Sequence, residues 1–144
     1  MSRTGSYGQS FATKLLSQDK LDEALTEAER AVALDPEDPE AMFDRAQVHL
    51  ALERWEAGVA DIERALELDR TARVLDDSLV DDALFSALVD WGRKVAETDR
   101  PRALAILERY LTLFPEARGS HQKDYEEWRR RLGGEQRTSW TRTR

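Results

Sequence analysis

The sequence predicts an all-α protein built from repeated pairs of helices, and three observations lead to this prediction. An ungapped offset of 34 residues lays residues 5–38 on residues 39–72. Within each of these units, apolar residues recur at i, i+3, i+4 and i+7, which is the period of an amphipathic helix. Residues that stop and start helices separate the two units. The offset aligns seven identical pairs, which are Ala12/Ala46, Leu16/Leu50, Glu29/Glu63, Arg30/Arg64, Ala31/Ala65, Leu34/Leu68 and Asp35/Asp69.

Each unit contains two helical segments, and the second segment shows the clearer pattern. The stripes run from Leu21 to Val32 in the first unit and from Trp55 to Leu66 in the second. Small residues at matching positions of the stripes allow antiparallel helices to approach closely. Between the units, residues 35–39 read Asp-Pro-Glu-Asp-Pro. This segment predicts a helix stop, then an N-cap at Asp38 and a first helical turn at Pro39.

In this pattern the chain resembles the tetratricopeptide repeat (TPR) family, whose unit is 34 residues long. The family has small residues where helices cross, a bulky residue that opens the second helix and a closing proline. In the first unit these positions are Ala12, Ala24 and Ala31, then Leu21, then Pro36. In the second unit the small residues are Ala46, Gly58 and Ala65, and the bulky residue is Trp55. The chain departs from the family at the bulky residue early in the first helix, which is Gly8 or Met42, and at the closing proline of the second unit, which is Arg70.

The resemblance implies a right-handed α-α superhelix of about three such helix pairs with a C-terminal capping helix, over residues 1–132. The repeats are expected at about 5–38, 39–72 and 85–117, and the extra residues 70–84 allow the third pair to start early. Tyr125, Trp128 and Leu132 share one helical face and predict the capping helix at about 120–132. Residues 133–144 are polar and basic without periodicity, which predicts a flexible tail.

Composition excludes several classes of protein. The chain has 144 residues, no cysteine and a net charge of −7. Disulfide frameworks, zinc fingers and thiol nucleophiles are thereby excluded, and a cytoplasmic location is expected. No apolar run is long enough for a signal peptide or a membrane span, so we expect no membrane insertion. Residues 19–99 hold 23 acidic and 9 basic side chains, so no nucleic-acid binding is expected. Arginine exceeds lysine, which suggests a GC-rich, bacterial genome.

The sequence shows no motif for catalysis, metal binding or cofactor binding. The acidic residues Asp76, Asp77, Asp81 and Asp82 lack calcium-loop spacing and are interpreted as capping and first-turn charges of a helix. His49 and His121 have no partner at metal-ligand spacing and are interpreted as structural. No serine lies in a nucleophile elbow, and no glycine-rich phosphate loop occurs. The sequence therefore predicts no enzyme, no metal and no cofactor.

Two further features are interpreted as mainly structural. Trp55, Trp91 and Trp128 lie on apolar stripes and are expected in the core, whereas Trp140 in the tail is either incidental or an anchor. The Arg129–Arg131 run is expected on the solvated face of the capping helix, where it matches the helix C-terminus.

The resemblance implies a protein-binding surface on the concave face, formed by the first helix of each pair. The positions implied are Gln9, Ser10 and Thr13, then Phe43, Asp44 and Gln47, then Val89, Asp90 and Arg93. Phe43 is either an apolar anchor for a partner or a packing residue. The carboxylate clamp of some family members is disfavoured, because only Arg93 is basic.

We therefore expect a protein or peptide partner of basic or amphipathic character. A homodimer or larger self-assembly through terminal helix faces or the tail, and a secretion-type client chaperone, stay open as alternatives.

Overall fold

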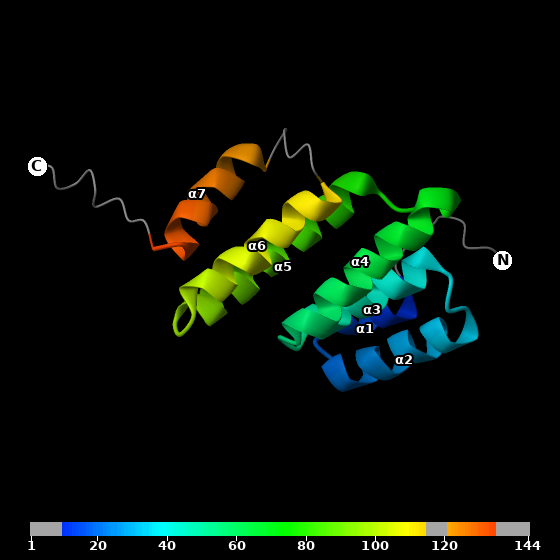
Figure 1. The fold of residues 1–144 in the computed structure, drawn as a ribbon. Coiled ribbons are helices and arrows are strands. Elements are labelled where there is room, and N and C mark those ends of the chain that lie inside the picture. Colours follow the sequence, from blue (N-terminus) through cyan, green and yellow to red (C-terminus); the bar gives the residue numbers. More distant parts are fainter. Residues whose placement is uncertain (1–9, 115–120, 135–144) are drawn as a thin grey trace, which may run out of the picture. The chain divides into compact units, whose positions relative to one another are not determined.

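The computed structural model describes residues 10–114 and 121–134, and over these ranges the chain forms seven helices and no strands (Figure 1). The predicted all-α helical-repeat class is therefore confirmed. The chain divides into two compact units, which we call unit one, up to Val80, and unit two, from Asp81 onward. None of the described helices is long and apolar enough to cross a membrane.

Unit one contains four helices that pack in chain order. They are α1 (Phe11–Ser17), α2 (Leu21–Leu34), α3 (Pro39–Ala51) and α4 (Trp55–Ala72). Helix α2 packs against both α1 and α3, and α3 packs against α4, as Figure 1 shows in blue to green. The two predicted helix pairs are thus α1 with α2 and α3 with α4.

The break between the pairs has the predicted chemistry. Helix α2 ends at Leu34, before Pro36, which has no N–H to continue the helix. The Asp38 carboxylate accepts a hydrogen bond from the Glu40 N–H at 3.0 Å and caps α3, and Pro39 occupies the first turn. The predicted stop and start are confirmed.

Small side chains let the helices of unit one approach closely. Ala24, Ala28, Ala46 and Ala65 are fully buried. At Gly58 on α4, a Cβ atom would lie 2.5 Å from Leu50 Cδ2 on α3, so no larger residue fits without movement of that side chain. These small residues therefore let the backbones of neighbouring helices in unit one come close together.

Unit two contains most of α5 (Asp77–Ala96), together with α6 (Arg100–Leu113) and α7 (Gln122–Leu132). Helix α5 begins at Asp77, before position 85, where the third repeat is predicted to start. The Asp76 carboxylate caps α5 by accepting from the N–H groups of Ser78 and Leu79 at 3.0 and 3.2 Å. Helix α7 lies within the range predicted for the capping helix. The last residues of the third predicted repeat, 115–117, and residues 135–144 of the predicted tail, including Trp140, lie outside the described residues.

Candidate peptide-binding surface

The first predicted surface positions lie at the start of α1. Ser10 is the N-cap residue, and its Oγ accepts a hydrogen bond from the Thr13 N–H at 3.1 Å. The Thr13 hydroxyl donates to the Ser10 carbonyl oxygen at 3.0 Å. These bonds satisfy both side chains locally and stabilise the first turn of α1. Gln9 lies outside the described residues.

The second group of predicted positions lies on α3. The Phe43 side chain is 1% exposed, so it packs in the core of unit one, and this burial favours the packing alternative over the anchor. Asp44 and Gln47 are half-buried. Of the three, Asp44 borders a cavity, which is described next.

An apolar cavity of about 190 Å³ lies between α1, α2 and Asp44 of α3. We call it the N-terminal cavity. It is smaller than the roughly 300–1,000 Å³ of small-molecule sites, so it suits a single anchoring side chain. Its lining residues are Ser10, Phe11, Ala12, Glu27, Ala28, Arg30, Ala31, Leu34 and Asp44.

Two apolar side chains at this cavity are largely exposed to solvent. Phe11 is 61% exposed and Leu34 is 80% exposed. Exposed apolar side chains at the border of an apolar cavity are typical of an interaction surface. Sequence reasoning missed both residues. The available signal was at Phe11, because the offset of 34 places it opposite the charged Arg45 of the second repeat.

A charged cluster joins α3 to α4 in unit one. Arg45 Nε and Nη2 donate to the two carboxylate oxygens of Asp61 at 2.8 and 3.0 Å. His49 Nε2 lies 3.8 Å from Asp61 Oδ2. The hydrogen bond to Asp61 raises the pKa of Arg45, and desolvation lowers the pKa of His49. Asp61 is only 8% exposed, so this bidentate pair fixes the two helices to each other.

The third group of predicted positions lies on α5 in unit two. Val89 is buried, whereas the side chains of Asp90 and Arg93 are 50% and 61% exposed. The Arg93 guanidinium carbon lies 5.5 Å from the ring centre of Trp128 on α7, and the Arg131 guanidinium carbon lies 4.8 Å from it. Trp128 thus makes cation–π contacts with two arginines and is half-buried. Asp90 and Arg93 thus form part of the α5–α7 surface of unit two.

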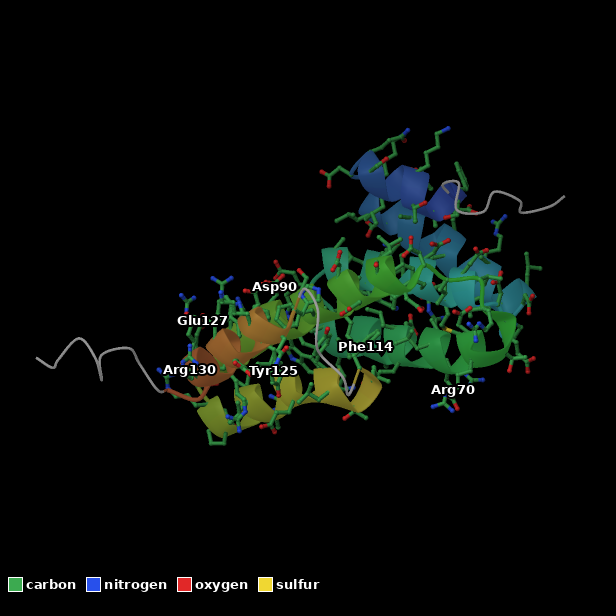
Figure 2. All side chains as sticks on the ribbon, turned by 90° about the horizontal axis from the view of Figure 1, so that it is seen from above. Arg70, Asp90, Phe114, Tyr125, Glu127 and Arg130 are labelled. Atoms are coloured by element: carbon green, nitrogen blue, oxygen red, sulfur yellow. The ribbon has the colours of Figure 1, made fainter. Side chains whose placement is uncertain are left out.

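The arginine run of α7 is exposed, as predicted. Arg130 and Arg131 both bond to Glu127, at 3.1 and 3.2 Å, and Arg129 lies 3.7 Å from Glu108 on α6. In Figure 2, Tyr125 points from α7 toward α6, whereas Glu127 and Arg130 lie on the other side of the helix. The run is a solvated helix face with local ion pairs.

An aromatic cluster forms the centre of unit two, and it corrects one interpretation of the acidic residues. Asp81 and Asp82 do not cap α5. Tyr110 donates to Asp81 at 2.5 Å, and His121 Nε2 lies 2.8 Å from Asp82 Oδ1. The His121 ring stacks on Phe85 with 4.5 Å between ring centres. Only Asp76 caps the helix, because Asp81 and Asp82 lie beyond the turn whose N–H groups are free.

No group of three or more metal-ligating side chains comes together in residues 10–114 and 121–134. His121 faces two aspartates, but the three side chains do not converge on one point that could hold an ion. The clusters of both units thus join helices, whereas the N-terminal cavity is bordered by the exposed apolar side chains of Phe11 and Leu34.

Comparison with known proteins agrees with the repeat pattern. Residues 14–77 match the tetratricopeptide repeat family. A segment of 58 residues is 41% identical to part of a DnaJ homolog subfamily C member 7 homolog from Schizosaccharomyces pombe, and makes up 40% of this chain and 12% of that protein. The chain thus spans a small part of the length of this relative. The predicted family resemblance is confirmed by these matches.

Proposed function

Because residues 14–77 are tetratricopeptide repeats, which serve as protein–protein interaction modules, we propose that this chain is a non-enzymatic adaptor or chaperone-like binding module. Its partner is a basic, amphipathic peptide or helix. An apolar side chain of that partner occupies the N-terminal cavity, and its basic residues lie near Asp44. The observation that carries this proposal is the apolar cavity with Phe11 and Leu34 exposed beside it.

The negative charge of unit one supports a basic partner. The described residues of unit one hold 18 acidic and 8 basic side chains. Glu27, Asp44 and Arg30 border the cavity itself, and Arg30 lies 3.9 Å from Glu27, so Asp44 adds the excess negative charge there. Such a surface attracts a cationic segment and repels an acidic one, which favours encounter and specificity. We place this binding in the cytoplasm, because a chain without cysteine is compatible with a reducing compartment.

Selection from a displayed peptide library on the immobilised chain tests the proposal. We expect enrichment of peptides with one large apolar residue next to lysine or arginine. The double variant Phe11→Ser/Leu34→Ser should weaken binding of these peptides at least tenfold, and Asp44→Lys should do the same. Phe11 and Leu34 are largely exposed, so their replacement should leave the fold intact.

The matched control is Val74→Ser, which removes another exposed apolar side chain of unit one, 48% exposed and outside the N-terminal cavity. It should leave peptide binding unchanged. Enrichment of no common pattern, or equal binding by the wild type and the Phe11→Ser/Leu34→Ser variant, would contradict the proposal.

Self-assembly is the competing function, and the same exposed patch favours it. Two copies could cover Phe11 and Leu34 by pairing at this patch. Sedimentation over a hundredfold concentration range distinguishes the two functions. A dimer that dissociates in the Phe11→Ser/Leu34→Ser variant would favour self-assembly, and a constant monomer mass would favour a peptide partner.

A further inference from the structure

A second cavity lies in unit one, at the turn between α4 and the start of α5. Its volume is about 350 Å³, and we call it the turn cavity. It lies within the size range of sites for small molecules, at the lower end. It is lined by Leu66, Asp69, Arg70, Arg73, Leu75 and Asp77. None of these residues borders the N-terminal cavity, so the inference below does not rest on the proposed function.

The turn cavity results from a departure of this chain from its own repeat. Helix α2 ends at Leu34, but α4 continues to Ala72, four residues beyond the corresponding position. Arg70 stands where the first repeat has Pro36. The additional helical turn places Arg70 and Arg73 beside the segment that leads into α5.

Asp69 gives the turn a fixed shape. Its side chain is buried, and Oδ1 accepts hydrogen bonds from the N–H groups of Val74 and Leu75 at 2.7 and 3.2 Å. The Asp69 carbonyl oxygen accepts from the Arg73 N–H at 2.8 Å, with Arg73 in the left-handed region at φ 54°. The walls of the turn cavity therefore do not depend on the two guanidinium groups.

Two of the residues that line the turn cavity, Arg70 and Arg73, are positively charged. Neither Arg70 nor Arg73 has an ion pair or a side-chain hydrogen bond to any described residue. Figure 2 shows the Arg70 side chain pointing away from α4 toward solvent. Of the two carboxylates in the lining, that of Asp69 is bonded to backbone N–H groups. Asp69 and Asp77 each carry a negative charge beside the two guanidinium groups, which disfavours polyanions.

We propose that the turn cavity binds a small organic anion. Arg70 and Arg73 bind its carboxylate or phosphate group, because the guanidinium fork matches oxyanions of this geometry. The side chains of Leu66 and Leu75 contact its apolar part. Nucleic acids and other polyanions are not ligands of this site.

Titration of the full ¹⁵N-labelled chain at constant ionic strength tests the proposal, with isovalerate, inorganic phosphate and neutral isovaleramide as probes. Saturable chemical-shift changes are expected at the amides of Val74, Leu75 and Asp77. Tighter binding of isovalerate would identify a carboxylate ligand, and tighter binding of phosphate a phosphate ligand. Isovaleramide should bind at least tenfold more weakly than isovalerate.

Two variants complete the test. Arg70→Gln/Arg73→Gln should weaken binding at least tenfold, and its circular dichroism spectrum should match the wild type, because both residues are exposed. Arg64→Gln is the control, since Arg64 lies on α4 outside the cavity and pairs with Glu67 at 3.1 Å. Shifts that grow linearly without saturation, or that persist in Arg70→Gln/Arg73→Gln, would overturn the proposal. Equal loss of binding in Arg64→Gln would also overturn it, as an effect of net charge.

Discussion

Unit one and unit two bring their helices together with different side chains. In unit one, four fully buried alanines and the close approach at Gly58 let the helices pack at short distance. In unit two, Tyr110 is the largest fully buried side chain, and its ring meets those of Phe85, Phe114, His121 and Tyr125 at centroid distances of 5.2 to 6.1 Å. Small residues recur with the repeat, whereas an aromatic cluster is assembled once.

This difference explains where the family resemblance ends. The match to the family covers residues 14–77, which lie within unit one. In unit two a tyrosine, Tyr110, is fully buried. The charges differ in the same way, because the described residues of unit two hold nine acidic and nine basic side chains, against 18 and eight in unit one. The family match and the excess of acidic side chains thus fall in the same part of the chain.

The largest effect is expected from Tyr110→Ala, which removes the centre of the unit-two cluster. We expect a loss of about 3–5 kcal/mol in the free energy of unfolding, as for other buried aromatic truncations. Urea unfolding measures the total loss, and hydrogen exchange of peptides from α6 and from α2 locates it. Exchange should become faster in α6 with little change in α2.

Tyr110→Phe is the control for this change. It keeps the ring contacts and removes only the hydrogen bond to the Asp81 carboxylate, which contributes about 1.5–3 kcal/mol. Equal acceleration of exchange in α2 and α6 of the Tyr110→Ala variant would show that the aromatic cluster supports both units.

A smaller effect is expected from Ala46→Leu in unit one. Ala46 is fully buried where α3 and α4 approach closely, since its carbonyl oxygen lies 3.2 Å from the position of a Cβ atom on Gly58, so a larger side chain has to displace its neighbours. Overpacking of this kind lowers the free energy of unfolding by about 1–3 kcal/mol. Thermal unfolding followed by circular dichroism measures the change.

The control is Ala57→Leu, at an exposed position of α4, where a change within about 0.5 kcal/mol is expected. Similar losses for Ala46→Leu and Ala57→Leu would mean that close helix approach is not what stabilises unit one.

The smallest effect is a pH dependence from His49. Desolvation lowers its pKa in the folded state, with partial opposition from Asp61, so the unfolded chain binds the proton more readily. The contribution to stability is complete above the unfolded pKa of about 6.5 and decreases as the pH falls below it. Its slope cannot exceed about 1.4 kcal/mol per pH unit.

Urea unfolding of wild type and His49→Gln between pH 5 and pH 8 isolates this contribution. The difference in unfolding free energy between the two proteins should be constant near pH 8, and the wild type should lose relative stability toward pH 5. A pH-independent difference would contradict the prediction.

Local patterns in the sequence predict the helices well, because the signals that start and stop them are local. Asp38 and Pro39 act on the first turn of α3, and Asp76 acts on the first turn of α5. Periodicity also identifies the small positions, such as Ala46 and Gly58, since the repeat offset aligns them with Ala12 and Ala24. These predictions needed no knowledge of contacts between distant segments.

The contacts that escaped prediction join residues far apart in the chain. Tyr110 and Asp81 are separated by 29 positions, and His121 and Asp82 by 39. No local pattern shows that such side chains meet. The exposure of Phe11 and Leu34 was missed for another reason, because an apolar residue on or near a helical stripe is expected to be covered by a neighbour. The sequence alone does not show whether that neighbour belongs to the same chain.

The Asp69 turn has a consequence for how this chain can vary among species. A left-handed residue after a helix is most often glycine, which carries no side chain and adopts this conformation without strain. Here position 73 is an arginine in the left-handed region, and the carboxylate of Asp69 holds the turn that follows it. We expect the two positions to change together during evolution. Orthologues that lack an aspartate at position 69 should carry glycine at position 73, and with it they would lose the guanidinium that faces the turn cavity.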